Sequence, residues 1–176
     1  YFRAPLYSWF LGVIYAISGP GAWAPRLVQA LLGAFASGGV AYTAGRLAGR
    51  TPAIAAGLVM ALYGPLVFSA GELLHEAVAV PLLVLALVFF VRGQAELHDE
   101  DAGALPWFLG ALALGLAAIA RPNALALAPA ALALPSLVAP GFRRARRVIL
   151  PVLAGVILPI LPVTAINFIS SGDLVW

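Results

Sequence analysis

The sequence contains no cysteine and no lysine, and only 10% of its 176 residues are charged. Without cysteine, disulfides and thiolate metal sites are excluded. The basic residues are all arginine, and their one cluster, at positions 143, 144, 146 and 147, has no aromatic residues interleaved with it. This arrangement favours a cytoplasmic loop that obeys the positive-inside rule over a nucleic-acid-binding surface. We therefore expect no nucleic-acid partner.

Apolar residues dominate what is present. Hydrophobic residues make up 63% of the chain, and the mean hydropathy is +1.02. A soluble fold of this size leaves too much surface in water to hide so much apolar area, so lipid is the expected solvent. A backbone that crosses lipid has to close its hydrogen bonds within helices or a barrel. Because the apolar runs are continuous rather than alternating, they predict an all-α, polytopic helical membrane protein.

Six apolar stretches are long enough to predict membrane spans. They are Leu27–Gly45, Pro52–Ala70, Leu73–Val91, Ala104–Ala120, Ala124–Phe142 and Val148–Phe168. A shorter stretch, Leu6–Ser18, is rich in aromatic residues and predicts an interfacial helix that lies flat on one membrane face. We therefore expect an outer-face segment at residues 1–26, a block of spans at residues 27–168, and the start of an outer loop at residues 169–176.

Alternating the six spans sorts the charged residues onto two sides. Seven arginines gather on one side, and three, Arg3, Arg26 and Arg121, gather on the other. The positive-inside rule places the seven-arginine side in the cytoplasm. We therefore expect a multi-pass protein of the plasma (inner) membrane with both chain ends outside. The chain begins without methionine, and we expect a fragment whose partners are membrane lipids and the remainder of its own longer chain.

Two carboxylates and an imidazole stand on the outer side, where the second span turns into the third. If the segment is helical, Glu72 and Glu76 share one face at i,i+4, with His75 beside Glu72. Carboxylates near hydrocarbon raise the free energy unless they are paired, protonated or bound to a cation. One interpretation is a solvated loop between two short helices. The other is a site in which Glu76 and Glu72 are catalytic candidates, and in which Glu72, His75 and Glu76 are candidate ligands of a divalent metal ion.

Arg121 occupies the next outer turn. Its permanent charge and planar donors suit a lipid phosphate, although snorkelling to ordinary headgroups explains it as well. Since Arg121 lies on the side of the two glutamates, we expect one surface to hold a phosphate-linked substrate and a base together. Asn123, Arg3, Tyr7 and Asn167 are further candidates for binding substrate or lipid phosphate. A helix-ending turn is the simpler explanation of Asn167.

Five segments together resemble a known family. In chain order they are Arg3–Trp9, Arg26–Gly33, Glu72–Glu76, Gly115–Asn123 and Asn167–Gly172. Their order and topology resemble the GT-C superfamily of polytopic glycosyltransferases, in particular its RgtA/B/C/D-like and dolichyl-phosphate-mannose protein mannosyltransferase branch. The resemblance implies transfer of a sugar from a polyprenyl-phosphate-linked donor to an acceptor on the outer membrane face. It also implies an acidic base in a first outer loop, which would precede Tyr1, so we expect this fragment to be inactive alone.

Two other classes of protein stay open at this stage. Transporters place ionisable residues near the bilayer midplane, whereas here such residues stand at the ends of the spans, which counts against a transporter module. A non-catalytic structural subunit of a membrane complex would use the small-residue stripe at Gly33, Ser37, Ala41 and Gly45 for helix packing. Such a subunit would be indifferent to substitution of Glu72 and Glu76.

Overall fold

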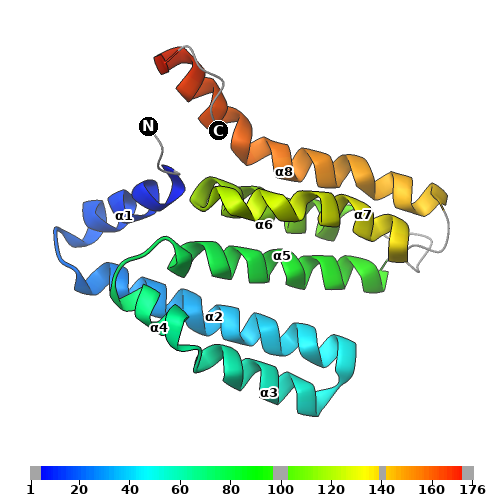
Figure 1. Cartoon of the computed structure of the whole chain (residues 1–176), viewed down its shortest axis with the longest axis horizontal. Coiled ribbons are helices and arrows are strands. Elements are labelled where there is room, and N and C mark those ends of the chain that lie inside the picture. The colour runs from blue at the N-terminus through cyan, green and yellow to red at the C-terminus, as the bar shows by residue number, and fades with distance from the viewer. Residues whose placement is uncertain (1–4, 97–102, 139–141, 172–176) are drawn as a thin grey trace.

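The computed structural model describes residues 5–96, 103–138 and 142–171, and within these ranges every regular element is a helix. The all-helical prediction is thus confirmed. The helices lie side by side in an elongated bundle (Figure 1). Their bounds are α1 (Pro5–Ser18), α2 (Trp23–Ala48), α3 (Arg50–Ala61), α4 (Gly64–Gly71), α5 (Glu76–Glu96), α6 (Leu105–Ala120), a 3₁₀ helix η1 (Pro122–Leu127), α7 (Ala128–Val138) and α8 (Phe142–Ser171).

The structure does not confirm the predicted number of membrane spans. Among the described residues, three helices are long and apolar enough to cross a membrane: α2, α5 and residues Arg146–Ser170 of α8. A fourth is added if α3 and α4, which are bent by 41° relative to each other, count as one broken span. The other apolar helices, α1, α6 and η1 with α7, are shorter. The six-span count is therefore not confirmed, although a helix occupies each predicted stretch.

The predicted span Pro52–Ala70 is not one continuous helix. α3 ends at Ala61, and α4 begins at Gly64 after Tyr63, whose backbone is extended. Pro65 explains the break, because it has no amide hydrogen to give to the carbonyl of Ala61 and is instead well suited to the first turn of a new helix. Average hydropathy does not register such a break, since both halves are apolar.

The predicted span Ala124–Phe142 is wrong at both ends. Its first residues belong to η1, α7 ends at Val138, and Phe142 is already the first residue of α8. The connection at residues 139–141 lies outside the described residues. Pro122 stands in the first turn of η1, a position that favours the start of a helix. The helical segment therefore starts before Ala124, as a 3₁₀ helix, and the α-helix α7 that follows is shorter than the predicted span.

The centre of the bundle is α6, which packs between α5 and α8. Eleven of its residues are buried, and Trp107 is completely enclosed. Glycines bring α6 and α8 into backbone contact. A Cβ atom on Gly115 would lie 2.5 Å from the carbonyl oxygen of Val156, and one on Gly155 would lie 2.6 Å from that of Phe108. Small residues allow such approaches where lipid supplies no hydrophobic drive between helices. This contact holds α6 firmly in place.

The small-residue stripe of α2 is used in part for packing. A Cβ atom on Gly57 of α3 would lie 2.9 Å from the Cβ of Ala41, and one on Gly45 would lie 3.2 Å from the Cβ of Ala53. At Gly33, by contrast, an added Cβ would meet no atom within 4 Å. The stripe therefore joins α2 to α3 at one end and leaves the other end open.

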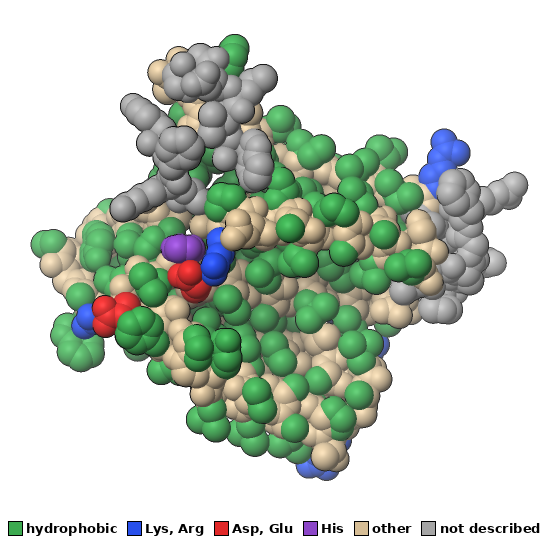
Figure 2. Space-filling model, in the orientation of Figure 1, with side chains coloured by type: hydrophobic (Ala, Val, Ile, Leu, Met, Phe, Trp, Pro, Cys, Tyr) green, Lys and Arg blue, Asp and Glu red, His purple; other side chains and the backbone are tan. Residues whose placement is uncertain are grey.

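Charged side chains gather at the two ends of the bundle, and apolar side chains cover the flank between them (Figure 2). The exposed apolar side chains include Leu31, Phe35 and Val59, as expected of a surface that faces lipid. We call one end the carboxylate end; it carries Arg26, Glu72, Glu76 and Arg121. The opposite end carries the other arginines whose side chains the structure describes, Arg46, Arg50, Arg92, Arg146 and Arg147.

Candidate functional site

The backbone reverses between Glu72 and Glu76. Glu72 is the residue that caps the C-terminal end of α4, and Glu76 is the first residue of α5. Between them, Leu73 has a φ of 55°, the left-handed conformation that is uncommon for a residue other than glycine. The two glutamates therefore do not share a helix face at i,i+4, and that prediction is wrong. The segment is a turn between two helices, which was the other interpretation of the sequence.

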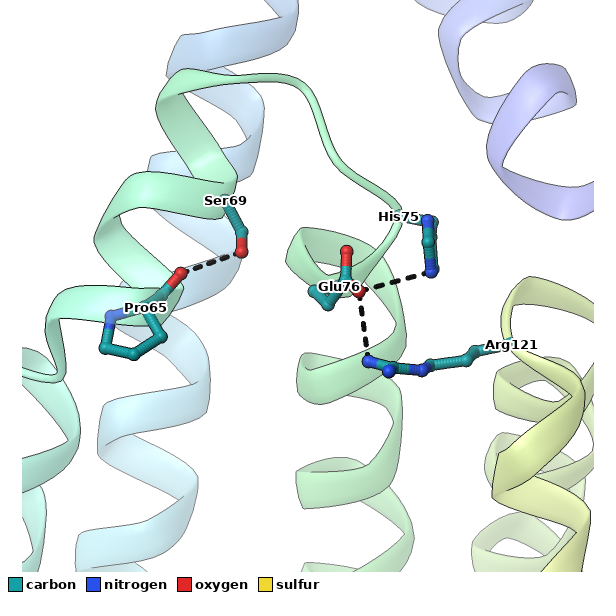
Figure 3. A network of polar contacts seen from close by, with 5 residues as sticks. All are labelled: Pro65, Ser69, His75, Glu76 and Arg121. Carbon is teal, nitrogen blue, oxygen red and sulfur yellow. Dashed lines mark hydrogen bonds and ion pairs between the residues drawn. The ribbon is translucent and has the colours of Figure 1, made fainter.

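Glu76 and Arg121 meet across the carboxylate end. The Nη1 atom of Arg121 donates a hydrogen bond to Oε1 of Glu76 at 3.0 Å, and Nε2 of His75 lies 3.2 Å from the same oxygen. Figure 3 shows Arg121 reaching from the end of α6 toward the first turn of α5, with His75 above it at the same carboxylate oxygen. The structure thus brings together two residues that are 45 positions apart in the chain.

A proline positions Arg121. α6 ends at Ala120, and Arg121 has an extended backbone with φ −147° and ψ 105°. Because the ring of a proline disfavours helical geometry in the residue before it, Pro122 accounts for this conformation. The amide of Arg121 still donates to the carbonyl of Ala117 at 2.7 Å. The side chain is therefore anchored to the last turn of a buried helix and points away from that helix.

The ion pair leaves hydrogen-bonding capacity on both partners. A guanidinium has five N–H donors, and the described contacts use only Nη1 of Arg121, whose side chain is 45% exposed. The Oε2 atom of Glu76 is buried and has no hydrogen-bond partner among the described residues. An exposed ion pair of this kind adds little stability. Its main effect is to fix one edge of the guanidinium and leave the remaining donors open to an anion.

Gln29 is a polar residue of this region that the sequence analysis missed. It is fully buried on α2, and its Nε2 donates to the hydroxyl oxygen of Tyr7 on α1 at 2.9 Å. Burial raises the pKa of the Tyr7 hydroxyl; the hydrogen bond from Gln29 lowers it, and the charges of Tyr15 and Glu76 raise it. In the sequence, the feature that could have pointed to Gln29 is its amide side chain within an apolar stretch.

The other candidates are on η1, on α8 or outside the described residues. Asn123 is exposed on η1, two residues after Arg121. Asn167 lies one turn before the end of α8, half-buried. Arg3 lies outside the described residues. Arg26, which the sequence left ambiguous, donates from Nε to the carbonyl of Gly71 at 2.8 Å, so it holds the end of α4 against the start of α2.

The structure does not gather the three residues predicted to bind a divalent metal into one cluster of ligands. Within the ranges that the structure describes, no group of three or more His, Cys, Asp or Glu side chains is placed to hold a metal ion. His75 and Glu76 are in contact, whereas Glu72 belongs to the end of α4. A metal at this position stays a prediction from the sequence.

Two apolar grooves reach the carboxylate end. The larger, about 730 Å³, runs between α2 and the α3–α4 pair, and its lining includes Arg26, Gln29 and Ala77. The smaller, about 480 Å³, lies among α1, α2 and α5, with Leu116 of α6 on its wall. Apolar lining with a few polar groups at one end suits a ligand that has a hydrocarbon chain and a polar head.

Comparison with protein families matches residues 3–167 to the family described as dolichyl-phosphate-mannose-protein mannosyltransferase. The matched segment contains the ion pair of Glu76 and Arg121 as well as Tyr7 and Gln29. Comparisons with curated proteins and with solved structures give no match.

Proposed function

Since the chain belongs to the dolichyl-phosphate-mannose-protein mannosyltransferase family, we propose that it transfers a sugar from a polyprenyl-phosphate donor to an acceptor on the extracytoplasmic face of the membrane. The family is one of membrane glycosyltransferases, and its name describes a lipid-linked sugar donor. The resemblance seen in the sequence is thereby confirmed at the level of the family.

The ion pair between Arg121 and Glu76 is the observation that carries this proposal. In the transfer, an acceptor oxygen bonds to the anomeric carbon of the sugar, and the bond from that carbon to the phosphate oxygen breaks. Negative charge then grows on the departing phosphate, while the acceptor proton passes to a carboxylate base. A preorganised cation stabilises that charge without having to reorient during the reaction. Glu76 preorganises Arg121 by holding Nη1, and the other guanidinium donors face the phosphate.

Charge distribution supports the choice of membrane face. The described arginines at the opposite end of the bundle outnumber the two at the carboxylate end, Arg26 and Arg121. Under the positive-inside rule the opposite end is cytoplasmic, so the carboxylate end faces outward. The location in the plasma (inner) membrane stays a prediction from the sequence. The apolar grooves beside the site are suitable for the isoprenoid chain of the donor.

A transfer assay tests the function directly. The full-length protein is reconstituted in liposomes, together with membrane extract as a source of acceptor and a panel of polyprenyl-phosphate donors that carry labelled hexoses or pentoses. We expect release of polyprenyl phosphate and movement of label to an acceptor for at least one donor. Folded protein that binds none of the donors and releases no polyprenyl phosphate would contradict the proposal.

The two glutamates are expected to differ in importance. Glu76→Gln keeps the shape of the side chain but removes the charge that holds Arg121, and a hydrogen bond to a charged group contributes on the order of 1.5–3 kcal/mol. We therefore expect a fall in kcat/KM of about tenfold to a hundredfold. Glu72→Gln is the matched control, because no described contact joins Glu72 to Arg121, and its effect should be smaller. A larger loss in Glu72→Gln than in Glu76→Gln would refute the orienting role of Glu76.

A further inference from the structure

Gln29 has an amide oxygen that is buried and unpaired. Its side chain is 0% exposed, and its Nε2 is satisfied by Tyr7, but Oε1 has no hydrogen-bond partner among the described residues. Buried polar atoms are nearly always paired in folded proteins, because an unpaired one loses its water without compensation. Among the described residues, the Gln29 amide therefore forms a hydrogen bond through its nitrogen and none through its oxygen.

A second unpaired acceptor belongs to the same region. Oε2 of Glu76 is buried without a partner among the described residues, while Oε1 takes both Arg121 and His75. The hydroxyl oxygen of Tyr7 accepts the hydrogen bond from Gln29, and burial raises the pKa of that hydroxyl. No described contact uses the Tyr7 proton, so the hydroxyl can donate it to a ligand.

These groups match the hydrogen bonding of sugar hydroxyls. Each hydroxyl both donates and accepts, so it can give its proton to an unpaired oxygen and accept the proton of Tyr7. A phosphate would be repelled by the Glu76 carboxylate and would find no donor on the Gln29 oxygen. Arg121, the ion-pair partner of Glu76, is the group suited to the phosphate, and the transferred sugar is bonded to that phosphate. Gln29 and Ala77, the neighbour of Glu76, also line the same groove.

We propose that Gln29, together with Tyr7, binds hydroxyl groups of the transferred sugar and determines which sugar the protein accepts. This inference rests on the proposed function. A site built to bond a substrate hydroxyl rejects an analogue that lacks it, because the polar groups of the protein are then left unpaired. Gln29 would thus be a specificity residue rather than only a link between α1 and α2.

Deoxy donors test this inference. For the donor that the wild-type protein uses best, each monodeoxy analogue is compared with the parent by kcat/KM, in wild type, Gln29→Leu and Tyr7→Phe. We expect wild type to disfavour at least one analogue by about tenfold or more. Gln29→Leu should be less active with the parent donor and should lose most of that discrimination, and Tyr7→Phe should lose part of it. Thr43→Val is the matched control, since Thr43 is also buried on α2 but bonds only to its own helix at Gly39.

The outcomes separate this inference from the function on which it rests. If wild type uses no polyprenyl-phosphate donor, the proposed function fails. If wild type transfers the parent sugar and every monodeoxy analogue equally well, the specificity role fails without any variant. If wild type discriminates and Gln29→Leu keeps the same discrimination, the role of Gln29 fails. Should Gln29→Leu not fold, as shown by thermal unfolding in detergent, Tyr7→Phe decides the question, because unchanged discrimination in that variant overturns the subsite.

Discussion

Replacing Arg121 by alanine is expected to lower the rate of sugar transfer by about 10²- to 10³-fold, the range seen when one preorganised group that stabilises developing negative charge is removed. The side chain is anchored at the end of α6 and already held by Glu76 at 3.0 Å, so in the proposed mechanism its charge meets the departing phosphate without rearrangement. The measurement is kcat for polyprenyl-phosphate release by the full-length protein in liposomes. Because the side chain is 45% exposed, its loss should leave folding and membrane insertion intact.

Two further variants make this result specific. Arg92→Ala removes an arginine of similar exposure at the opposite end of the bundle, whose Nη2 lies 4.0 Å from Oε1 of Glu96. The rate of sugar transfer should be unchanged in this variant. Arg121→Lys keeps the charge but loses the planar fork, so we expect only partial recovery relative to alanine. Wild-type rates in Arg121→Ala, with correct insertion shown by protease accessibility, would remove Arg121 from the mechanism.

Gly115→Ala is expected to destabilise the protein by about 1–3 kcal/mol, the usual range for adding a carbon to a tightly packed interior. The new Cβ would lie 2.5 Å from the carbonyl oxygen of Val156 and 3.1 Å from that of Gly155. Both are backbone atoms of α8, which cannot rotate aside as the tip of a side chain can. The helices therefore have to separate. The midpoint of thermal unfolding in detergent, followed by circular dichroism, measures the change.

A second glycine provides the comparison for this variant. Gly38 lies on α2, and an added Cβ there would meet no atom within 4 Å. Since alanine is the better helix former, Gly38→Ala should leave stability unchanged or raise it by roughly 0.5–1 kcal/mol. Equal stability of Gly115→Ala and Gly38→Ala would show that the close contact between α6 and α8 does not govern the stability of the bundle.

The sequence predicted where helices lie better than where they break. Hydropathy located α2, α5 and most of α8, because each is one long apolar helix. It did not find the bend before Pro65, because hydropathy counts apolar atoms and takes no account of backbone hydrogen bonds. It placed α6 to within one residue, but it did not predict that other helices enclose α6, since a helix enclosed by other helices and one surrounded by lipid have the same composition.

The candidate site was predicted in outline. Alternation of helices along the chain placed Glu76 and Arg121 on one side, and the structure brings them into contact. The spacing of Glu72 and Glu76 was misleading, because a single left-handed residue, Leu73, turns the chain between them. Gln29 carries no charge and stands alone in an apolar run, so charge patterns could not reveal it. Its environment depends on Tyr7, which belongs to another helix.

Because α5 and α8 enclose α6, the position of the site at the end of α6 depends little on the thickness of the bilayer. A helix of 16 residues is about 24 Å long, less than the hydrocarbon layer of about 30 Å. Because neighbouring helices cover α6, this mismatch does not have to be met by thinning the lipid around it. Longer or shorter acyl chains act first on the outer helices, through tilt, and reach Arg121 through the glycine contact with α8 and through Glu76 on α5.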